Sequence, residues 1–209
     1  MTQALAAFDE HGIVLATDSR ATRFAPGGSS PEVFSVKKLF PLNNCCAILS
    51  GGAGVSASLS LSLRRMLARH RGPLDLEEIA PFALDFLSRG YGRHLDQHGP
   101  EAQGFRRIYF ILAGYSPERP PPGFELLLLG SEENQLPLQL IPVNRLVVMP
   151  RNLGMEMRLF QAVNRNVPLA ELLQMSKEFL ERMAAVKDEV GPPYYFATIT
   201  AQGYQSVTP

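Results

Sequence analysis

Strand-forming and helix-forming segments occur in separate runs along this chain, and their order limits the fold more than any other feature. Short apolar segments with strand character fill the first 50 residues, and helical patterns follow at about 54–71 and 76–97. Strands are expected again up to residue 149, then two more helices, and a closing hairpin at 194–207. A parallel sheet requires strands and helices to alternate, so the runs predict antiparallel sheets packed against helix layers, an α+β fold.

The helices are placed by apolar periodicity and by residues that favour helix ends. Asp75 followed by Glu78 is typical of a capping box before the second helix. Pro81 lies beyond the first turn of that helix and is expected to kink it. A third helix is predicted over 153–164, and a fourth begins at Pro168, because proline is favoured in a first helical turn.

The strands are short apolar runs bounded by turn residues. A Pro-Gly-Gly-Ser-Ser-Pro segment between Arg23 and Glu32 is typical of a loop at the edge of a sheet. Strands are expected at 3–8, 13–18, 33–41 and 45–50 before the first helix, and at 105–114, 124–129, 136–141 and 145–149 before the third.

The composition is that of a chain that can bury a core. The 209 residues carry 20 basic and 20 acidic side chains, so the formal net charge is zero, and 45% are hydrophobic. These values exclude a disordered chain and a nucleic-acid binder held mainly by positive charge. No apolar run approaches the roughly 20 residues that cross a bilayer, and no basic signal-peptide region opens the chain. We therefore expect a single cytoplasmic domain over 1–209, with no nucleic-acid or membrane partner.

Cys45 and Cys46 are the only cysteines, and they are adjacent. Side chains of neighbouring residues in a strand point to opposite faces, so a bridge between the two is not expected. Two thiols also cannot build a cysteine-based zinc site. The pair is interpreted as buried, reduced thiols of a cytosolic protein.

Five segments together carry a family resemblance. They are GIVLATDSRAT at 12–22, VKKL at 36–39, SGGA at 50–53, ILAGY at 111–115 and GFEL at 123–126. In these segments the chain resembles the proteasome β-type subunits, which are N-terminal nucleophile (Ntn) hydrolases; the first half is specific and the last third is weak. The resemblance implies a four-layer αββα sandwich, in which two antiparallel sheets are flanked by helix pairs.

The resemblance also implies a catalytic site. In that family the catalytic aspartate lies sixteen residues after the mature N-terminal threonine, and Asp18 lies sixteen residues after Thr2. Lys38 matches the catalytic lysine. Gly51 matches the glycine whose backbone N–H stabilises the oxyanion, and Asp188 matches a supporting aspartate near the last hairpin.

The chemistry of the first three residues can be argued independently. Removal of Met1 would free the α-amine of Thr2, and such an amine has a pKa of about 7.7–8, which suits a general base near neutral pH. A Lys38 ammonium beside this amine would keep it neutral by like-charge repulsion. Asp18 would pair with that ammonium, because a buried unpaired charge is costly.

Three features depart from the family pattern. Gly191 stands where a serine follows the supporting aspartate, and Gln3 replaces a small or hydroxylated residue. The Gly-Ser-Gly element that usually opens the third helix is missing, and Asn152-Leu-Gly stands near its place.

Together these residues predict a threonine peptidase that hydrolyses peptide bonds in peptides or unfolded proteins. The resemblance implies a homo-oligomeric ring and a partner unfoldase ATPase, and the hydrolysis needs no cofactor or metal. Two alternatives stay open. One is a non-catalytic ring or scaffold subunit of the same fold, and the other is an amidase that acts on a small molecule.

Overall fold

The structure, a computed structural model, describes residues 2–23, 32–70, 72, 74–98 and 107–209. Its helices are α1 (Ser56–Leu67), α2 (Leu76–His98), α3 (Leu153–Asn164) and α4 (Leu169–Val186). Its strands are β1 (Ala4–Phe8), β2 (Ile13–Thr17), β3 (Arg20–Arg23), β4 (Glu32–Ser35), β5 (Leu39–Pro41), β6 (Cys46–Gly52), β7 (Ile108–Tyr115), β8 (Phe124–Ser131), β9 (Gln139–Ile141), β10 (Leu146–Met149), β11 (Tyr195–Thr200) and β12 (Gly203–Val207). The predicted loop between Arg23 and Glu32 and the predicted removal of Met1 concern residues outside the described ones.

The described strands form three antiparallel sheets, where two were predicted. Five strands associate in the order β10-β1-β2-β11-β12, five others in the order β5-β6-β7-β8-β9, and β3 pairs with β4 in a separate two-stranded sheet. The expected αββα sandwich of two antiparallel sheets flanked by helix pairs is therefore wrong. The correction matters for function, because the additional sheet lies next to the candidate site described below.

The cause of this difference lies in a segment that was predicted as one strand over 33–41. It divides into β4 and β5, and β4 turns away to pair with β3, with Arg20 opposite Ser35 and Arg23 opposite Glu32. Every residue of β4 is exposed or half-buried. Hydrophobic burial therefore does not draw β4 into a core sheet, whereas Leu39 and Phe40 of β5 are buried and pair with β6.

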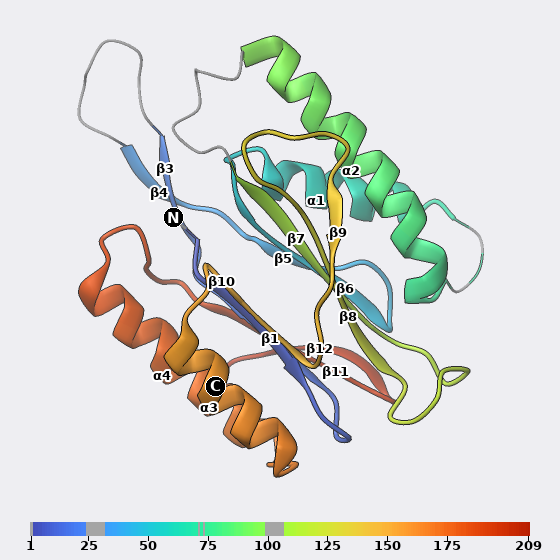
Figure 1. The fold of residues 1–209 in the computed structure, drawn as a ribbon, viewed down its shortest axis with the longest axis vertical. Coiled ribbons are helices and arrows are strands. Elements are labelled where there is room, and N and C mark those ends of the chain that lie inside the picture. The colour runs from blue at the N-terminus through green and yellow to red at the C-terminus, as the bar shows by residue number, and fades with distance from the viewer. Residues whose placement is uncertain (1, 24–31, 71, 73, 99–106) are drawn as a thin grey trace.

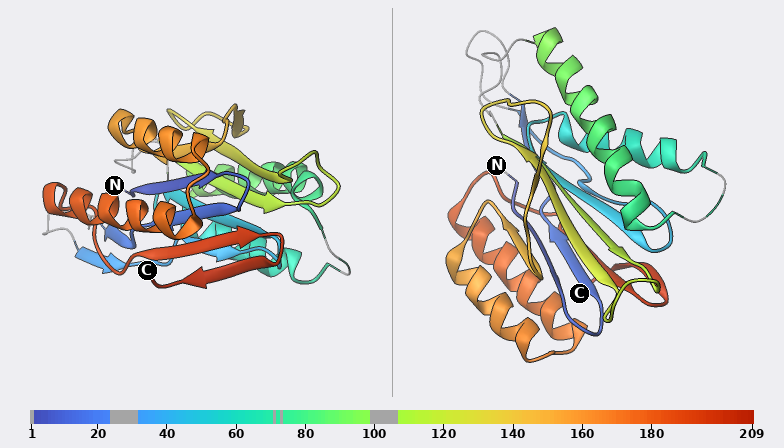
Figure 2. Two further views of the ribbon diagram at one scale, coloured as in Figure 1. Left: turned by 90° about the horizontal axis from the view of Figure 1, so that it is seen from below. Right: turned by 45° about the vertical axis from the view of Figure 1, so that its right-hand side comes forward.

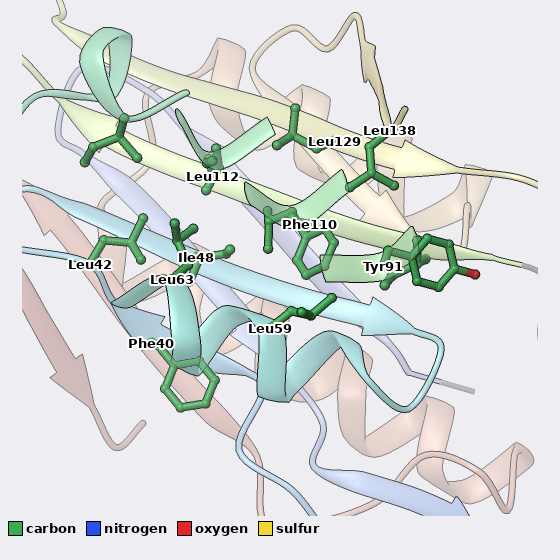
Figure 3. Close-up of a cluster of buried hydrophobic side chains, with 14 of the residues drawn as sticks. Phe40, Leu42, Ile48, Leu59, Leu63, Tyr91, Phe110, Leu112, Leu129 and Leu138 are labelled. Atoms are coloured by element: carbon green, nitrogen blue, oxygen red, sulfur yellow. The ribbon is translucent and has the colours of Figure 1, made fainter. Parts of the chain in front are cut away.

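One apolar cluster joins α1 and α2 to the sheet that contains β6, β7 and β8. Figure 3 shows Ile48, Leu63 and Phe110 converging in this cluster, with Tyr91 of α2 at one end. All four side chains are fully buried. Because burial of a large apolar side chain contributes about 1.5–3 kcal/mol relative to exposure, this cluster fixes α1 and α2 on β6, the strand whose last residues reach the candidate site.

Two further clusters complete the core. One lies between the two five-stranded sheets and includes Leu15, Leu49 and Ile111. The other joins α3 and α4 to the sheet that contains β1 and β2, through residues such as Leu159 and Leu180. Figures 1 and 2 show α3 and α4 lying next to each other, on the opposite side of the strands from α1 and α2.

Predicted helix ends are confirmed at two places. The Asp75 carboxylate accepts the Glu78 N–H at 2.9 Å, and the Glu78 carboxylate accepts the Asp75 N–H at 3.0 Å, which is the expected capping box. Asn152 caps α3 by accepting the Met155 N–H at 3.0 Å. Helix α2 continues through Pro81 to His98. Among the helices of the described residues, none is both long and apolar enough to cross a membrane.

The adjacent cysteines do not point to opposite faces. Their Sγ atoms lie 3.8 Å apart, and both backbone N–H groups donate to the side-chain oxygen of Asn43. Cys45 lies in this turn and Cys46 is the first residue of β6, so the pair does not have the strand geometry on which the expectation rested. Cys46 is buried, Cys45 is half-buried, and both are free thiols.

Candidate active site

The antiparallel pairing of β1 with β2 brings the start of the chain beside Asp18. Ala4 lies opposite Thr17 in this pair, so Gln3 and Asp18 are the next residues at the same edge. The Asp18 N–H donates to the Gln3 carbonyl at 3.1 Å, and the Gln3 N–H donates to Asp18 Oδ1 at 2.9 Å. Thr2 is therefore held one residue from the carboxylate, as the spacing of sixteen predicts.

Lys38 approaches the same carboxylate from the residue before β5. Its Nζ lies 3.0 Å from Asp18 Oδ1 and also donates to the Arg20 carbonyl at 2.8 Å. The Arg20 N–H donates to the second oxygen, Asp18 Oδ2, at 3.0 Å. Lys38 is 3% exposed and Asp18 is fully buried, so this is a desolvated, hydrogen-bonded ion pair.

Burial shifts the pKa values of both partners toward their neutral forms. Desolvation raises the pKa of Asp18 above 3.8, although the Lys38 ammonium and the two backbone N–H groups oppose that shift. Desolvation lowers the pKa of Lys38 below 10.5, although Asp18 opposes it. Shifted pKa values of this kind cluster at functional sites and also occur in structural ion pairs.

A pocket of about 300 Å³ opens beside this pair. Thr2 and Lys38 both contribute to its wall, so the hydroxyl-bearing residue and the buried ammonium face one cavity. Residues of the two-stranded sheet, the start of α1 and the loop after α4 complete it. These lining residues are Arg20, Ala21, Thr22, Val33, Val36, Gly52, Gly54, Ser56, Ala57, Asp188 and Glu189.

The end of β6 presents Gly52 to the pocket, whereas Gly51 packs under an aromatic ring. Gly51 pairs with Tyr109 of β7, and a Cβ at position 51 would overlap the Tyr109 phenol. Gly52 has a φ of +86°, which favours glycine. The Ser50 N–H donates toward β5 and the Ala53 N–H donates toward β7. Because amide directions alternate along a strand, the Gly52 N–H is expected on the β5 side, where the pocket lies.

Asp188 reaches the site through its backbone. Its carbonyl accepts a hydrogen bond of 2.6 Å from Arg20 Nη1, and its side chain is exposed at the wall of the pocket. The Ser19 N–H donates to the Gly191 carbonyl at 3.3 Å, and a Cβ at Gly191 would crowd the Arg20 guanidinium. The loop after α4 is thus fixed to the segment that carries Asp18.

Of the five residues predicted for the site, Thr2, Lys38 and Asp188 line the pocket, and Asp18 lies behind Lys38. Sequence reasoning missed Arg20 and Gly52. Arg20 was within the 12–22 segment that carried the resemblance, but nothing in the sequence showed that its side chain would bind the Asp188 carbonyl. The Gly51-Gly52 pair was a signal for Gly52, but the sequence alone does not show which of the two glycines would donate its N–H to the oxyanion.

The described residues contain no group of three or more His, Cys, Asp or Glu side chains that could hold a metal ion. The pocket and its surroundings present Thr2 with its hydroxyl, the buried Lys38–Asp18 ion pair, and the charged residues Arg20, Asp188 and Glu189.

Comparison with solved structures gives a match over the whole chain. The structure is similar to an Anbu (Gly-1) mutant from Hyphomicrobium sp. strain MC1, with a TM-score of 0.67 and 16% sequence identity, covering 100% of this chain and 86% of that chain. No family model matches the chain, and no curated protein matches it.

These findings correct the sequence-based recognition. The identification as a proteasome β-type subunit is wrong as a statement about family, because short motifs suggested it while no family model matches the sequence. At 16% identity the likeness to Anbu is one of fold.

Proposed function

We propose that this chain is a threonine-type hydrolase that cleaves peptide bonds, with Thr2 as the nucleophile after removal of Met1. The observation that carries the proposal is the Lys38–Asp18 ion pair of 3.0 Å, buried behind a pocket that Thr2 and Lys38 share. A buried ammonium is costly to maintain and would add little to a surface pocket that binds nothing. Near the hydroxyl and the freed α-amine of Thr2, the ammonium would have a chemical role, because it would favour the neutral form of that amine.

The reaction begins at Thr2. Its hydroxyl oxygen attacks the carbonyl carbon of the scissile peptide bond, and the hydroxyl proton passes to the α-amine of the same residue. The C–N bond of the substrate then breaks, and the departing amine takes the proton from the α-ammonium. The result is an ester between Thr2 Oγ1 and the acyl half of the substrate.

Water completes the cycle. The α-amine takes a proton from a water molecule as the water oxygen attacks the ester carbonyl. The C–Oγ1 bond breaks, Oγ1 regains a proton from the α-ammonium, and the carboxylic acid product leaves. Atoms and protons balance without an oxidant or a cofactor.

Lys38 and Gly52 are proposed to stabilise charge during these steps. The Lys38 ammonium lines the same pocket as Thr2, and a positive charge near the freed α-amine would favour the neutral amine, which is the form that can act as a base. The Gly52 N–H is the candidate donor to the oxyanion of the tetrahedral intermediate, in place of the Gly51 N–H that the sequence suggested. Loss of such a donor costs on the order of 3–4 kcal/mol in other hydrolases.

The direct test is hydrolysis of a broad panel of fluorogenic peptides by the wild type, Thr2→Ala and Thr2→Ser. Thr2→Ala is expected to lose activity by on the order of a thousandfold or more, because the nucleophile is gone. Thr2→Ser keeps a hydroxyl and an amine and is expected to keep measurable activity. Thr208→Ala, at an exposed residue near the end of the chain, is the matched control and should equal the wild type.

Equal hydrolysis by the wild type and Thr2→Ala would contradict the proposal and point to a contaminant or another nucleophile. A wild type that is inert across the panel and keeps Met1 by intact mass would favour the non-catalytic subunit. The ring assembly and the unfoldase ATPase stay predictions. Light scattering of the purified protein tests the first of them.

A further inference from the structure

Tyr109 is buried beside Thr2, and neither the sequence motifs nor the reaction described above uses it. Its Oη lies 3.2 Å from the Thr2 carbonyl oxygen and 3.4 Å from the Met149 carbonyl oxygen, and it can donate to either. The side chain comes from β7, at the register position opposite Gly51. A phenol carries one proton, so the shorter contact, to Thr2, is the better hydrogen bond.

The Thr2–Gln3 peptide unit is held at both of its polar ends. Its carbonyl oxygen accepts from Tyr109, and its N–H donates to Asp18 Oδ1 at 2.9 Å. A peptide group is planar and rigid, so holding its oxygen and its nitrogen leaves it only rotation about the line between these two atoms. The Cα of Thr2 lies in that plane and carries both the hydroxyl side chain and the α-amine.

We propose that Tyr109 is a positioning residue that holds the Thr2–Gln3 peptide plane and thereby sets where Thr2 presents its hydroxyl and amine. The effect of Tyr109 on the reaction rests on the proposed function. The holding of the Thr2–Gln3 peptide by Tyr109, called the clamp below, can be tested without activity. Positioning of this kind has large effects, because a displacement of about 1 Å at a reacting group can cost a hundredfold in rate.

Two features of the fold are explained by this role. Gly51 has to lack a side chain, because a Cβ there would overlap the Tyr109 phenol. Burial also raises the pKa of Tyr109, which favours the protonated phenol, the form that can donate this hydrogen bond.

Tyr109→Phe removes the hydroxyl and keeps the ring, and Tyr91→Phe is its matched control. Tyr91 is also a fully buried tyrosine, and it donates to Asn134 Oδ1 at 2.6 Å; it belongs to the cluster between α2 and the sheet and does not line the pocket. Both variants remove the hydroxyl of a buried tyrosine and the hydrogen bond that it donates. A merely structural effect would therefore appear in both, whereas the clamp predicts effects that are confined to Tyr109→Phe.

Two readouts are measured on the full chain. Hydrogen exchange at the Gln3 amide, followed by NMR in protein labelled at glutamine, is expected to become roughly five- to tenfold faster in Tyr109→Phe, as the loss of one hydrogen bond predicts. The saturating rate of Thr2 modification by a peptide epoxyketone is expected to fall by about the same factor, with an unchanged half-saturating concentration. Tyr91→Phe should leave both values at the wild-type level.

Gln3 exchange that is equal in Tyr109→Phe and Tyr91→Phe would overturn the clamp. If the wild type is not modified at Thr2 at all, the proposed function fails, and Gln3 exchange alone then decides on the clamp. Should Tyr109→Phe not fold, Gly51→Ala displaces the phenol while keeping the tyrosine. Faster Gln3 exchange in that variant supports the clamp, and unchanged exchange contradicts it.

Discussion

The Lys38 ammonium lies 3.0 Å from a carboxylate oxygen of Asp18, and both side chains are almost completely buried. Asp18 receives three donors, from Lys38, the Gln3 N–H and the Arg20 N–H, so its negative charge is satisfied on every side. A pair of this kind costs desolvation energy that its attraction only partly offsets. Its presence behind a pocket is therefore better explained by chemistry than by stability.

Removing one charge of the Lys38–Asp18 pair should lower the stability of the protein more than removing both charges. Lys38→Met leaves the Asp18 carboxylate buried without its counter-ion and is expected to lower the free energy of unfolding by about 3–5 kcal/mol. Asp18→Asn combined with Lys38→Met removes both charges and is expected to be more stable than Lys38→Met alone, because no uncompensated charge stays buried. Urea unfolding of the three proteins at neutral pH measures both effects. A double variant less stable than Lys38→Met would contradict this account.

The pair should also give a specific pH dependence of stability. Asp18 has a folded-state pKa above 3.8, so its stabilising contribution is present below pH 3.8 and is lost as the pH rises through the raised value. Lys38 has a folded-state pKa below 10.5, so its contribution appears as the pH rises through the lowered value toward 10.5. Relative to the double variant, the wild type is expected to be least stable at intermediate pH. A maximum there would show that the pair is net stabilising.

Gly52 should tolerate no side chain. Its φ of +86° is unfavourable for other residues, and a Cβ would overlap the Arg107 carbonyl. Gly52→Ala is expected to cost about 1–3 kcal/mol from the backbone conformation alone, measured by chemical denaturation. Gly54→Ala is the control, because nothing lies within 4 Å of a Cβ at that position. Equal stability of the two variants would contradict the backbone geometry at the end of β6.

The two thiols should differ strongly in reactivity. The hydrogen bond from Cys46 lowers the pKa of Cys45 to about 7, whereas that contact and burial raise the pKa of Cys46. Because the thiolate is the reactive form, iodoacetamide is expected to modify Cys45 with a midpoint near pH 7 and to spare Cys46 in the folded protein. Peptide mapping by mass spectrometry distinguishes the two. Faster modification of Cys46 would contradict the assignment.

Local signals in the sequence were sufficient for the helices. The Asp75–Glu78 capping box and the periodic leucines of α4 act within a few residues, and α3 has the bounds that were predicted. They were not sufficient for the sheets. Whether Glu32–Ser35 joins a core sheet depends on burial against distant strands, and the sequence did not show that Val33, an apolar residue, would stay exposed.

The same limit applies to the site. The spacing of Thr2 and Asp18 was informative because β1 and β2 are neighbours in sequence and pair without a long insertion. Tyr109 and Arg20 each contact a residue more than a hundred positions away in the sequence. Residue spacing along the chain does not predict contacts of this kind. The choice between Gly51 and Gly52 depends on which way each amide points, and that is decided by the register of β6 against β7.

The most direct test of the central claim is the mass of residue 2 after treatment with a peptide epoxyketone, which needs both a hydroxyl and a free α-amine on one residue. We predict that Met1 is absent and that a single adduct forms on Thr2 in the wild type, and that none forms in Thr2→Ala. Retention of Met1, or an adduct that is unaffected by Thr2→Ala, would contradict the claim that Thr2 is the nucleophile.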